Sequence, residues 1–340
     1  MELQAKTSEL DAQFTVRPCT MDDLQAVVDL FNTVDRPYHD ADIHDIVDFK
    51  MGWEIENFNL ETSTRAIFNG DGEMIAYGEV YDVRAIPVRP SVWLRVHPNY
   101  DVEQIGTWLL HWSEERARQV FDRVPDDARV MLEVDVLREK DAMKRLLEDF
   151  GLTTDRGFYT MLIEMDEAPA LPQTPDNLRM TTHAEEPDIT LREIYRAIKD
   201  SFQDHRGHVE EPFEEGFARF EAYAKKDQKI TPATTILAMD GDKIAGISAC
   251  RLESWDAPDR GHVNTLGVMR EYRRKGLGDA LLRHSFKMFW DMGQKKVDLG
   301  VDASSLTNAV GLYERAGMHI DKVYDAYEKE LRPGKEYSKQ

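Results

Sequence analysis

Residues 262–278 read HVNTLGVMREYRRKGLG, an apolar, strand-like run followed by a loop of basic residues and glycine. The loop itself is Arg273-Arg274-Lys275-Gly276-Leu277-Gly278, and a segment with apolar residues at helical spacing follows it. Glycine lets the backbone turn tightly and approach a ligand, and the first turn of a helix presents unpaired N–H groups. Together these features predict an anion-binding site of the kind that holds a pyrophosphate.

Two better-known nucleotide-binding loops do not fit this segment. The GxxxxGK[ST] spacing of a Walker loop is absent, and so is the GxGxxG fingerprint of a dinucleotide-binding fold. The spacing RxxGxG is a weak signal when it stands alone. Its interpretation therefore depends on the segments that follow it in the chain.

A second motif follows the predicted helix. The strand-like run 297–301 leads into TNAVGLYERAGM at 307–318, where Asn308 and Tyr313 lie five residues apart. On a helix, these two side chains project from neighbouring faces toward the end of the preceding strand. The order strand, RxxGxG, helix, strand and N-x4-Y-x3-G resembles the GNAT acetyltransferase superfamily. The resemblance is closest to its tandem two-domain branch, which includes mycothiol synthase.

The resemblance implies how acetyl-CoA binds and reacts. The residues whose backbone amides would hold its pyrophosphate are Arg273, Arg274, Lys275, Gly276, Leu277 and Gly278. The main chain of Leu266, Gly267 and Val268, splayed from its neighbouring strand, would pair with the pantetheine arm. Asn308 matches the asparagine that usually contacts the pantetheine region. Tyr313 matches the tyrosine that protonates the departing thiolate, a role suited to a phenol of pKa about 10.

The catalytic base is less sharply indicated. In the mycothiol synthase branch a glutamate stands at the start of the strand before the loop, and His262 occupies that place here. Histidine has a suitable pKa for the role. The alternative is a hydrogen-bonded histidine at a strand edge, with the proton removed through water. Asn264, two residues further on, is expected to face the same side of the strand and to orient a substrate or a water.

A further segment supplies candidates for the acceptor site. Residues 201–209, SFQDHRGHV, resemble a phrase of the tandem enzymes in which an aromatic residue follows the Asp-His pair, where this chain has Arg206. The segment falls in the helical region that covers the acceptor pocket in this fold. Asp204 and His205 are therefore candidate substrate-binding residues, with a solvated loop as the alternative. No spacing here matches a four-ligand metal site, so we expect no bound metal.

The chain contains a divergent internal repeat, in which three stretches of the first half match three of the second. These are 66–83 with 236–252, 91–118 with 262–290, and 131–151 with 298–317. Each copy is expected to form a hairpin, strand, loop, helix, strand, helix and strand. The fold class is therefore α+β, with two tandem GNAT-like domains whose mixed, mostly antiparallel sheets are flanked by helices.

A polar, proline-rich segment between the two copies has the composition of a linker. The expected parts of the chain are a disordered lead-in 1–13, a first domain 14–168, a linker 169–177, a catalytic domain 178–333 and a tail 334–340.

The first copy keeps the apolar pattern of the second, but it has different residues at the positions that bind the cofactor or take part in catalysis. Its loop reads Asp101-Val102-Glu103-Gln104-Ile105-Gly106, so acidic side chains replace an arginine and the lysine, and Gln104 replaces a glycine. Leu146 or Leu147 stands at the position of the tyrosine, and Asp141 at that of Asn308. Acidic side chains repel a pyrophosphate. We therefore expect this copy to be inactive and to pack against the active copy and shape its acceptor pocket.

Composition and charge narrow the functional classes. A formal net charge of −21 over 340 residues argues against a nucleic-acid partner. No apolar run approaches the roughly 20 residues that a membrane helix needs, and the N-terminus lacks the features of a secretory signal. Cys19 and Cys250 are too few for a disulfide framework and are expected to be buried, inert thiols. The expected location is the cytoplasm.

These features predict an enzyme that moves an acetyl group from acetyl-CoA to a primary amine. A small-molecule acceptor is favoured because two fused domains give more walls for an enclosed pocket. Protein or peptide N-acetylation is the alternative within enzymes, and a non-catalytic acyl-CoA-binding regulatory module is the alternative outside them. Such a module needs the loop but not Tyr313. The oligomeric state is expected to be monomer or homodimer.

Overall fold

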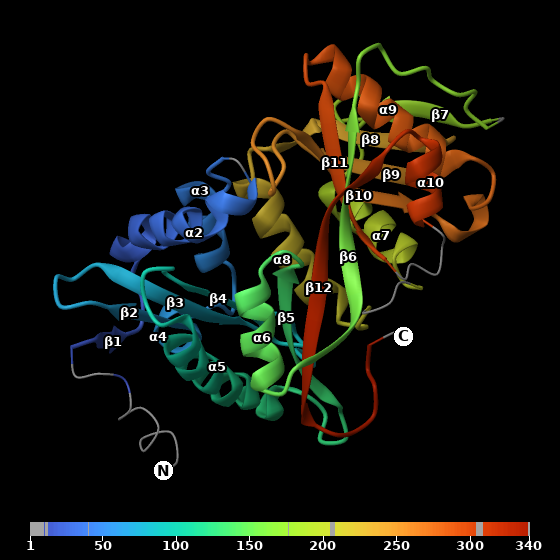
Figure 1. The fold of residues 1–340 in the computed structure, drawn as a ribbon. Helices are drawn as coiled ribbons and strands as arrows, with labels where there is room; N and C mark the ends of the chain where they lie inside the picture. Colours follow the sequence, from blue (N-terminus) through green and yellow to red (C-terminus); the bar gives the residue numbers. More distant parts are fainter. Residues whose placement is uncertain are drawn as a thin grey trace. The chain divides into compact units, whose positions relative to one another are not determined.

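The structure is a computed structural model, and its descriptions cover residue 10 and residues 13–39, 41–175, 177–204, 208–303 and 309–338. The chain divides into two compact units, each made of discontinuous segments. Unit 1 comprises Met1–Gly157, Val209–Gly216 and Tyr324–Ser338, and unit 2 comprises Phe158–His208, Phe217–Val323 and Lys339–Gln340. The strands of the 12-stranded sheet are divided between the units, and each unit combines strands with helices, so the predicted pair of α+β domains is confirmed (Figure 1).

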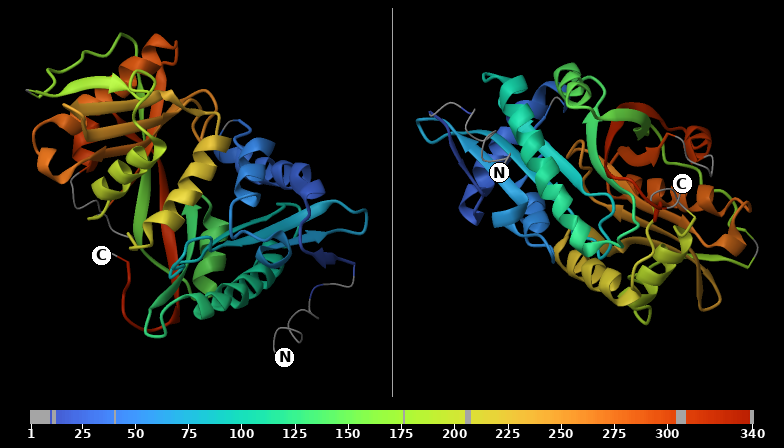
Figure 2. Two further views of the ribbon diagram at one scale, coloured as in Figure 1. Left: turned by 180° about the vertical axis from the view of Figure 1, so that it is seen from behind. Right: turned by 90° about the horizontal axis from the view of Figure 1, so that it is seen from below.

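The sheet of unit 1 runs in the order β1-β2-β3-β4-β5-β12, and only β4 and β5 are parallel. Its strands are β1 (Thr15–Arg17), β2 (Thr64–Phe68), β3 (Met74–Tyr81), β4 (Ser91–Val96) and β5 (Val130–Leu137). Its helices are η2 (Met21–Asp23), α2 (Leu24–His39), α3 (Ile46–Trp53), α4 (Leu60–Ser63), α5 (Val102–Arg118), η3 (Gln119–Arg123) and α6 (Asp141–Asp149). Helices α2 and α5 cover opposite faces of this sheet (Figures 1 and 2).

The sheet of unit 2 runs in the order β6-β11-β10-β9-β8-β7, and only β10 and β11 are parallel. Its strands include β7 (Arg179–Thr182), β8 (Ile230–Asp240), β9 (Lys243–Arg251), β10 (Gly261–Val268) and β11 (Lys296–Asp302). The helices are α7 (Leu191–Ser201), α8 (Phe213–Lys226, which begins in unit 1), η4 (Arg270–Tyr272), α9 (Leu277–Asp291) and α10 (Ala309–Arg315). Helix α9 packs on one face of the sheet and α7 on the other (Figure 2).

The repeat predicted from the sequence is visible in matching elements. Helices α6 and α10 end at equivalent glycines, Gly151 and Gly317, whose φ angles are +89° and +100°. Glycine is favoured there because a left-handed residue at the end of a helix costs other residues steric energy. A long strand follows each glycine: β6 (Thr153–Glu164) in the first copy and β12 (His319–Arg332) in the second.

These two final strands are exchanged between the units. From Tyr324 to Arg332, β12 pairs antiparallel with β5, so the second copy's last strand completes the sheet of unit 1. From Phe158 to Glu164, β6 pairs antiparallel with β11, so the first copy's last strand completes the sheet of unit 2. The predicted bounds 14–168 and 178–333 follow the repeat, and the compact units differ from them at each final strand.

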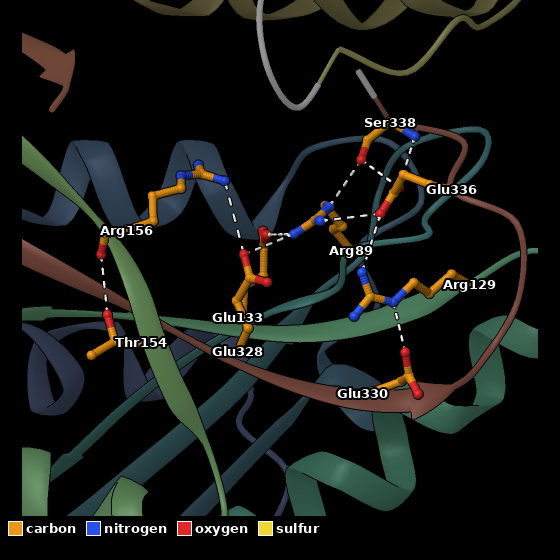
Figure 3. Close-up of polar contacts among 9 residues, drawn as sticks. All are labelled: Arg89, Arg129, Glu133, Thr154, Arg156, Glu328, Glu330, Glu336 and Ser338. Carbon is orange, nitrogen blue, oxygen red and sulfur yellow. Dashed lines mark hydrogen bonds and ion pairs between the residues drawn. The ribbon is translucent and has the colours of Figure 1, made fainter. Parts of the chain in front are cut away.

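Ion pairs bind the end of the chain into unit 1. Arg89 reaches Glu133 on β5, Glu328 on β12 at 3.0 Å and Glu336 at 3.5 Å, as Figure 3 shows. Arg129 adds a contact of 2.6 Å with Glu330. Two side chains of β12, the aromatic Tyr327 and the aliphatic Leu331, lie in the core of this unit. In the described ranges, no helix combines the length and the apolar composition that a membrane span requires.

Candidate active site

A wedge opens between β10 and β11 in unit 2. The two strands pair only through Gly261 with Val297 and His262 with Asp298, whereas β10 stays paired with β9 as far as Val268. Beyond His262 the edge of β10 that faces β11 is therefore unpaired among the described residues. This is the splay that was predicted for Leu266, Gly267 and Val268. Their contact with a pantetheine arm remains a prediction.

A β-bulge lies inside this wedge. Val263 pairs with Cys250 and Thr265 with Ala249, so Asn264 is an extra residue without a partner in the ladder. A bulge interrupts the alternation of side chains and re-aims the residue that it inserts. The expectation that Asn264 shares the side of His262 relied on unbroken alternation, which does not apply here. Asn264 is exposed, and its role in binding substrate stays a prediction.

The loop after β10 ends in a helix terminus that no side chain caps. Gly276 precedes α9 with a φ of +82°, Arg274 also lies in the left-handed region at +61°, and no side-chain hydrogen bond caps the helix. A Cβ atom added at Gly276 would meet none of the described atoms within 4 Å, so the requirement for glycine here comes from its left-handed backbone rather than from crowding. Unpaired amides and the helix dipole make such a terminus suitable for an anion.

Arg273 is engaged by the protein itself. Its guanidinium donates to the carbonyl of Val268 at 3.1 Å, to the carbonyl of Ser201 at 2.9 Å and to Asp204 Oδ2 at 2.9 Å. Arg273 therefore ties the loop to the end of α7, and its side chain is not directed solely at a ligand. Asp204 was predicted as an acceptor-site residue, and its carboxylate is ion-paired here; His205 lies outside the described residues.

The end of α7 also explains a glycine in the wedge. A side chain at Gly267 would overlap Ser201 and come within 3.2 Å of Phe202. Only glycine lets the helix end lie against the strand at this point. The packing of α7 against β10 therefore explains why residue 267 is glycine, without any reference to a ligand.

Tyr313 lies in α10 within the apolar cluster under the sheet. Its side chain is largely buried with Leu282, Phe286 and Val301, and burial raises its pKa to about 12. The hydroxyl therefore keeps its proton throughout the neutral and mildly alkaline range. A Cβ atom added at Gly278 would lie 3.5 Å from Cδ2 of Leu312 on the same helix, so α10 lies beside the loop. Asn308 lies outside the described residues.

His262 has a partner that the sequence did not reveal. Its Nδ1 lies 2.6 Å from Asp298 Oδ1, and Ser254 Oγ donates to Asp298 Oδ2, also at 2.6 Å. Asp298 has an exposed fraction of 0% and the His262 side chain 13%. The only sequence signal was an acidic residue within the apolar run 297–301. Finding its partner required the parallel register of β10 and β11. Among the described residues, no group of three or more His, Cys, Asp or Glu side chains is placed to hold a metal ion.

The corresponding helix terminus in unit 1 is occupied. Helix α5 begins at Val102, three positions earlier in the repeat alignment than α9, so Gln104 is helical where Gly276 is left-handed. Asp101 caps the helix by accepting a hydrogen bond from the amide of Gln104 at 2.9 Å. The protein's own carboxylate thus holds the position that an anion would take.

Unit 1 has buried ion pairs at residues that follow the paired stretch of β4 and β5. Strands β4 and β5 pair only at Ser91 and Glu133. Arg95, at the position of Gly267, donates to Asp35 at 2.9 Å, and Lys140 and His44 contact the same carboxylate. Burial favours a higher pKa for Asp35, but the charges of Arg95 and Lys140 and the hydrogen bond with His44 outweigh it and hold the pKa well below its usual range.

On the helical side of unit 1, a side chain at Gly106 would overlap Leu146, which stands at the tyrosine position. The first copy therefore has side chains at both of the positions that the resemblance assigns to the cofactor; its loss of catalysis remains a prediction.

We expect acetyl-CoA to bind at one site per chain, because only unit 2 combines an open wedge with an uncapped helix. Titration calorimetry measures this number directly. Gly276→Gln introduces the residue of the first copy and should weaken binding about 5- to 30-fold, since a left-handed non-glycine residue costs about 1–2 kcal/mol. Gln104→Gly in the first copy is the matched control and should change neither affinity nor stoichiometry. Two equivalent sites would contradict the prediction.

Comparison with known proteins finds similarity to acetyltransferases. Residues 191–318 match the Acetyltransferase (GNAT) family. A mycothiol acetyltransferase of Corynebacterium glutamicum (strain R) is 31% identical over 108 residues, which are 32% of this chain and 36% of that protein. The chain thus spans about a third of the length of the first curated relatives that it matches.

Two solved structures extend over nearly the whole chain. A GCN5-related N-acetyltransferase from Sphaerobacter thermophilus is 28% identical, with a TM-score of 0.78 over 96% of this chain and 98% of that one. A tandem GNAT protein from the clavulanic acid biosynthesis pathway, 13% identical, has the same fold, with a TM-score of 0.71 over 95% of this chain and 100% of the other.

The splayed strands β10 and β11 and the loop before α9 lie within the residues that match the acetyltransferase family. Residues 191–318 thus match the GNAT acetyltransferase family, and the chain as a whole has the fold of a tandem GNAT protein.

Proposed function

We propose that the chain transfers an acetyl group from acetyl-CoA to a primary amine on a small molecule, and that unit 2 alone performs the reaction. The observation that carries this proposal is the open strand edge of β10 next to the uncapped N-terminus of α9. An extended pantetheine arm can add to a strand edge through main-chain hydrogen bonds. The amides of the helix terminus suit the pyrophosphate that precedes the arm.

The arm and the pyrophosphate are assigned to residues as follows. Leu266, Gly267 and Val268 would bind the pantetheine arm through the edge of β10 that faces β11. The carbonyl of Val268 already accepts a hydrogen bond from Arg273. The loop residues that would hold the pyrophosphate are Arg274, Lys275, Gly276, Leu277 and Gly278. Arg273 supports this loop from the side of α7. We retain Asn308 as a contact to the arm and Asn264, Asp204 and His205 as candidates for the acceptor.

The chemistry requires the removal of two protons from the substrate ammonium and the addition of one to sulfur. His262 takes the first proton, and the neutral amine forms the new C–N bond with the thioester carbon as the C–S bond breaks. Tyr313 gives its proton to the thiolate, and the nitrogen's second proton restores the phenol. The net products are an N-acetylamine, CoA as its thiol and one proton, which His262 releases to solvent.

The relatives favour a small-molecule acceptor. Relatives of this chain carry the name mycothiol acetyltransferase, and that name suggests a small-molecule substrate. Two fused domains also provide more walls for an enclosed acceptor pocket, and such a pocket suits a small molecule better than a polypeptide. Protein acetylation and non-catalytic acyl-CoA binding are the outcomes that a test must separate from this proposal.

The proposal is tested by following CoA release from acetyl-CoA with a thiol dye across polyamines, amino sugars, aminoglycosides, amino acids and peptides. Cys19 and Cys250 are buried, and burial raises their pKa values to about 12 and 11, so their reaction with the dye should be slow. We expect turnover with one class of small amine, and slower turnover in Gly276→Gln when acetyl-CoA is below saturation.

Each contrary result has a distinct meaning. Turnover with peptides alone would replace the small-molecule acceptor by a polypeptide. Binding of acetyl-CoA with no turnover across the panel would favour the regulatory module. Failure to bind acetyl-CoA would overturn the proposal as a whole.

A further inference from the structure

Asp298 and His262 form a buried pair at the closed end of the wedge. They are opposite one another in the only paired stretch of β10 and β11, just before the strands diverge. His262 Nδ1 and Asp298 Oδ1 are 2.6 Å apart, and the other carboxylate oxygen accepts from Ser254 at 2.6 Å. The paired backbones hold both partners in register, so the ring and the carboxylate have little freedom to separate.

We propose that Asp298 is a positioning residue for the catalytic base, and that it fixes His262 in the form that has its hydrogen on Nδ1 and an unprotonated Nε2. This inference rests on the proposed function, because it concerns how the acceptor amine loses its proton. An ionised carboxylate only accepts hydrogen bonds, so the ring nitrogen that faces it must be the donor. Nε2 is then the nitrogen that accepts the substrate's proton.

The carboxylate also acts after the proton has been transferred. A protonated imidazole within 2.6 Å of a buried carboxylate is stabilised by a charge-assisted hydrogen bond. Without that partner, the ring would become a cation in a largely buried position, which is unfavourable. Arg260 lies 3.9 Å from Asp298 Oδ2 and is paired with Asp321 at 2.5 Å. Arg260 thus places a positive charge near the oxygen that also accepts the hydrogen bond from Ser254.

The first copy provides an internal comparison. In unit 1, Ser91 and Glu133 pair where β4 and β5 begin to separate, as His262 and Asp298 do in unit 2. Glu133 contacts Arg89, so its carboxylate is used in the ion pairs that hold the end of the chain. The copy with a closed cofactor wedge thus has the same strand arrangement without the histidine pair. The fold does not require the pair, which argues for a role in the reaction.

The test is a double-mutant cycle in the full-length chain, with kcat measured for the best amine of the panel. His262→Ala should lower kcat about 100-fold, and Asp298→Asn about 10- to 100-fold. The KM for acetyl-CoA should stay within about twofold in both variants. Because Asp298 acts through His262, adding Asp298→Asn to His262→Ala should produce little further loss. A purely structural carboxylate would instead lower kcat by the same factor in both backgrounds.

A spectroscopic measurement on the unmodified chain covers the case in which Asp298→Asn fails to fold. The chain has ten histidines, and ¹⁵N-histidine labelling with His262→Gln assigns the signals of His262. We expect a proton on Nδ1, with a strongly downfield ¹H resonance from its short hydrogen bond. A proton on Nε2 of the neutral ring would overturn the inference.

The kinetic outcomes separate this inference from the proposed function. Normal turnover in His262→Ala, or in Asp298→Asn, would overturn the inference and leave the acetyl transfer intact. A wild-type chain that acetylates no amine would overturn the proposed function, and the role of the pair would fail with it.

Discussion

Replacing Tyr313 by phenylalanine is expected to lower kcat about 100- to 1,000-fold while the Kd for acetyl-CoA stays within about twofold. The substitution removes one hydroxyl group from a largely buried ring and leaves its apolar contacts with Leu282 and Phe286 in place. The departing thiolate then lacks its proton donor, whereas binding of the intact thioester does not depend on that proton. Steady-state kinetics and titration calorimetry on the same preparation measure the two quantities.

Tyr100→Phe is the matched control. Tyr100 is the first copy's residue next to its occupied helix terminus, and its hydroxyl accepts a hydrogen bond from Asn69 at 3.0 Å. Because unit 1 takes no part in the proposed chemistry, this variant should retain wild-type kcat. Equal kcat values for Tyr313→Phe and the wild type would show that the thiolate is protonated by another group, although acetyl transfer itself would stand.

The pH dependence of the same comparison tests the state of the phenol. Burial raises the pKa of Tyr313 to about 12, so the proton is present below that value and is lost only as the pH rises through it. The ratio of wild-type kcat to that of Tyr313→Phe should therefore stay constant from pH about 7 to pH about 10, where an exposed tyrosine begins to ionise. A ratio that falls toward one within this range would contradict a buried, protonated donor.

The loop of unit 2 was predictable because its signals are local. Gly276 is left-handed and uncapped, and an RxxGxG spacing before an amphipathic segment encodes such a turn directly. The loss of the loop in the first copy was predictable for the same reason. The acidic residues in Asp101–Gly106 favour a capped helix start, and Asp101 forms that cap.

The closure of the first copy's wedge was not predictable from the loop. Asp35 comes from α2 and Lys140 from the turn before α6, and they meet Arg95 only when the unit folds. The pairing of His262 with Asp298 has the same origin, because the register of parallel strands is set by the whole sheet rather than by either strand. Pairings of this kind are not expressed in sequence spacing.

The exchange of final strands was missed for a related reason. β6 and β12 occupy equivalent places in the repeat, and each follows a helix that ends in a left-handed glycine. Their alternation of side chains indicates that they are strands, but it does not indicate which sheet edge each one joins. The sequence therefore predicted the two sheets and assigned each final strand to its own copy.

The exchange predicts that a substitution in either copy destabilises the other unit. Tyr327 belongs to the second copy, yet it is 1% exposed in the core of unit 1, where its hydroxyl donates to Glu148 at 2.8 Å. Tyr327→Ala should destabilise unit 1 by about 3–5 kcal/mol. Met161 belongs to the first copy and is fully buried in unit 2, so Met161→Ala should destabilise that unit by about 2–5 kcal/mol.

Hydrogen–deuterium exchange with peptide resolution distinguishes the two units. Tyr327→Ala should accelerate exchange first in β5, its pairing partner, and Met161→Ala first in β11. His319→Ala is the control, since this exposed residue at the other end of β12 should change local stability by less than about 0.5 kcal/mol. The two patterns would be reversed if each final strand completed the sheet of its own copy. Tyr327→Ala would then accelerate exchange in β11, and Met161→Ala would accelerate it in β5.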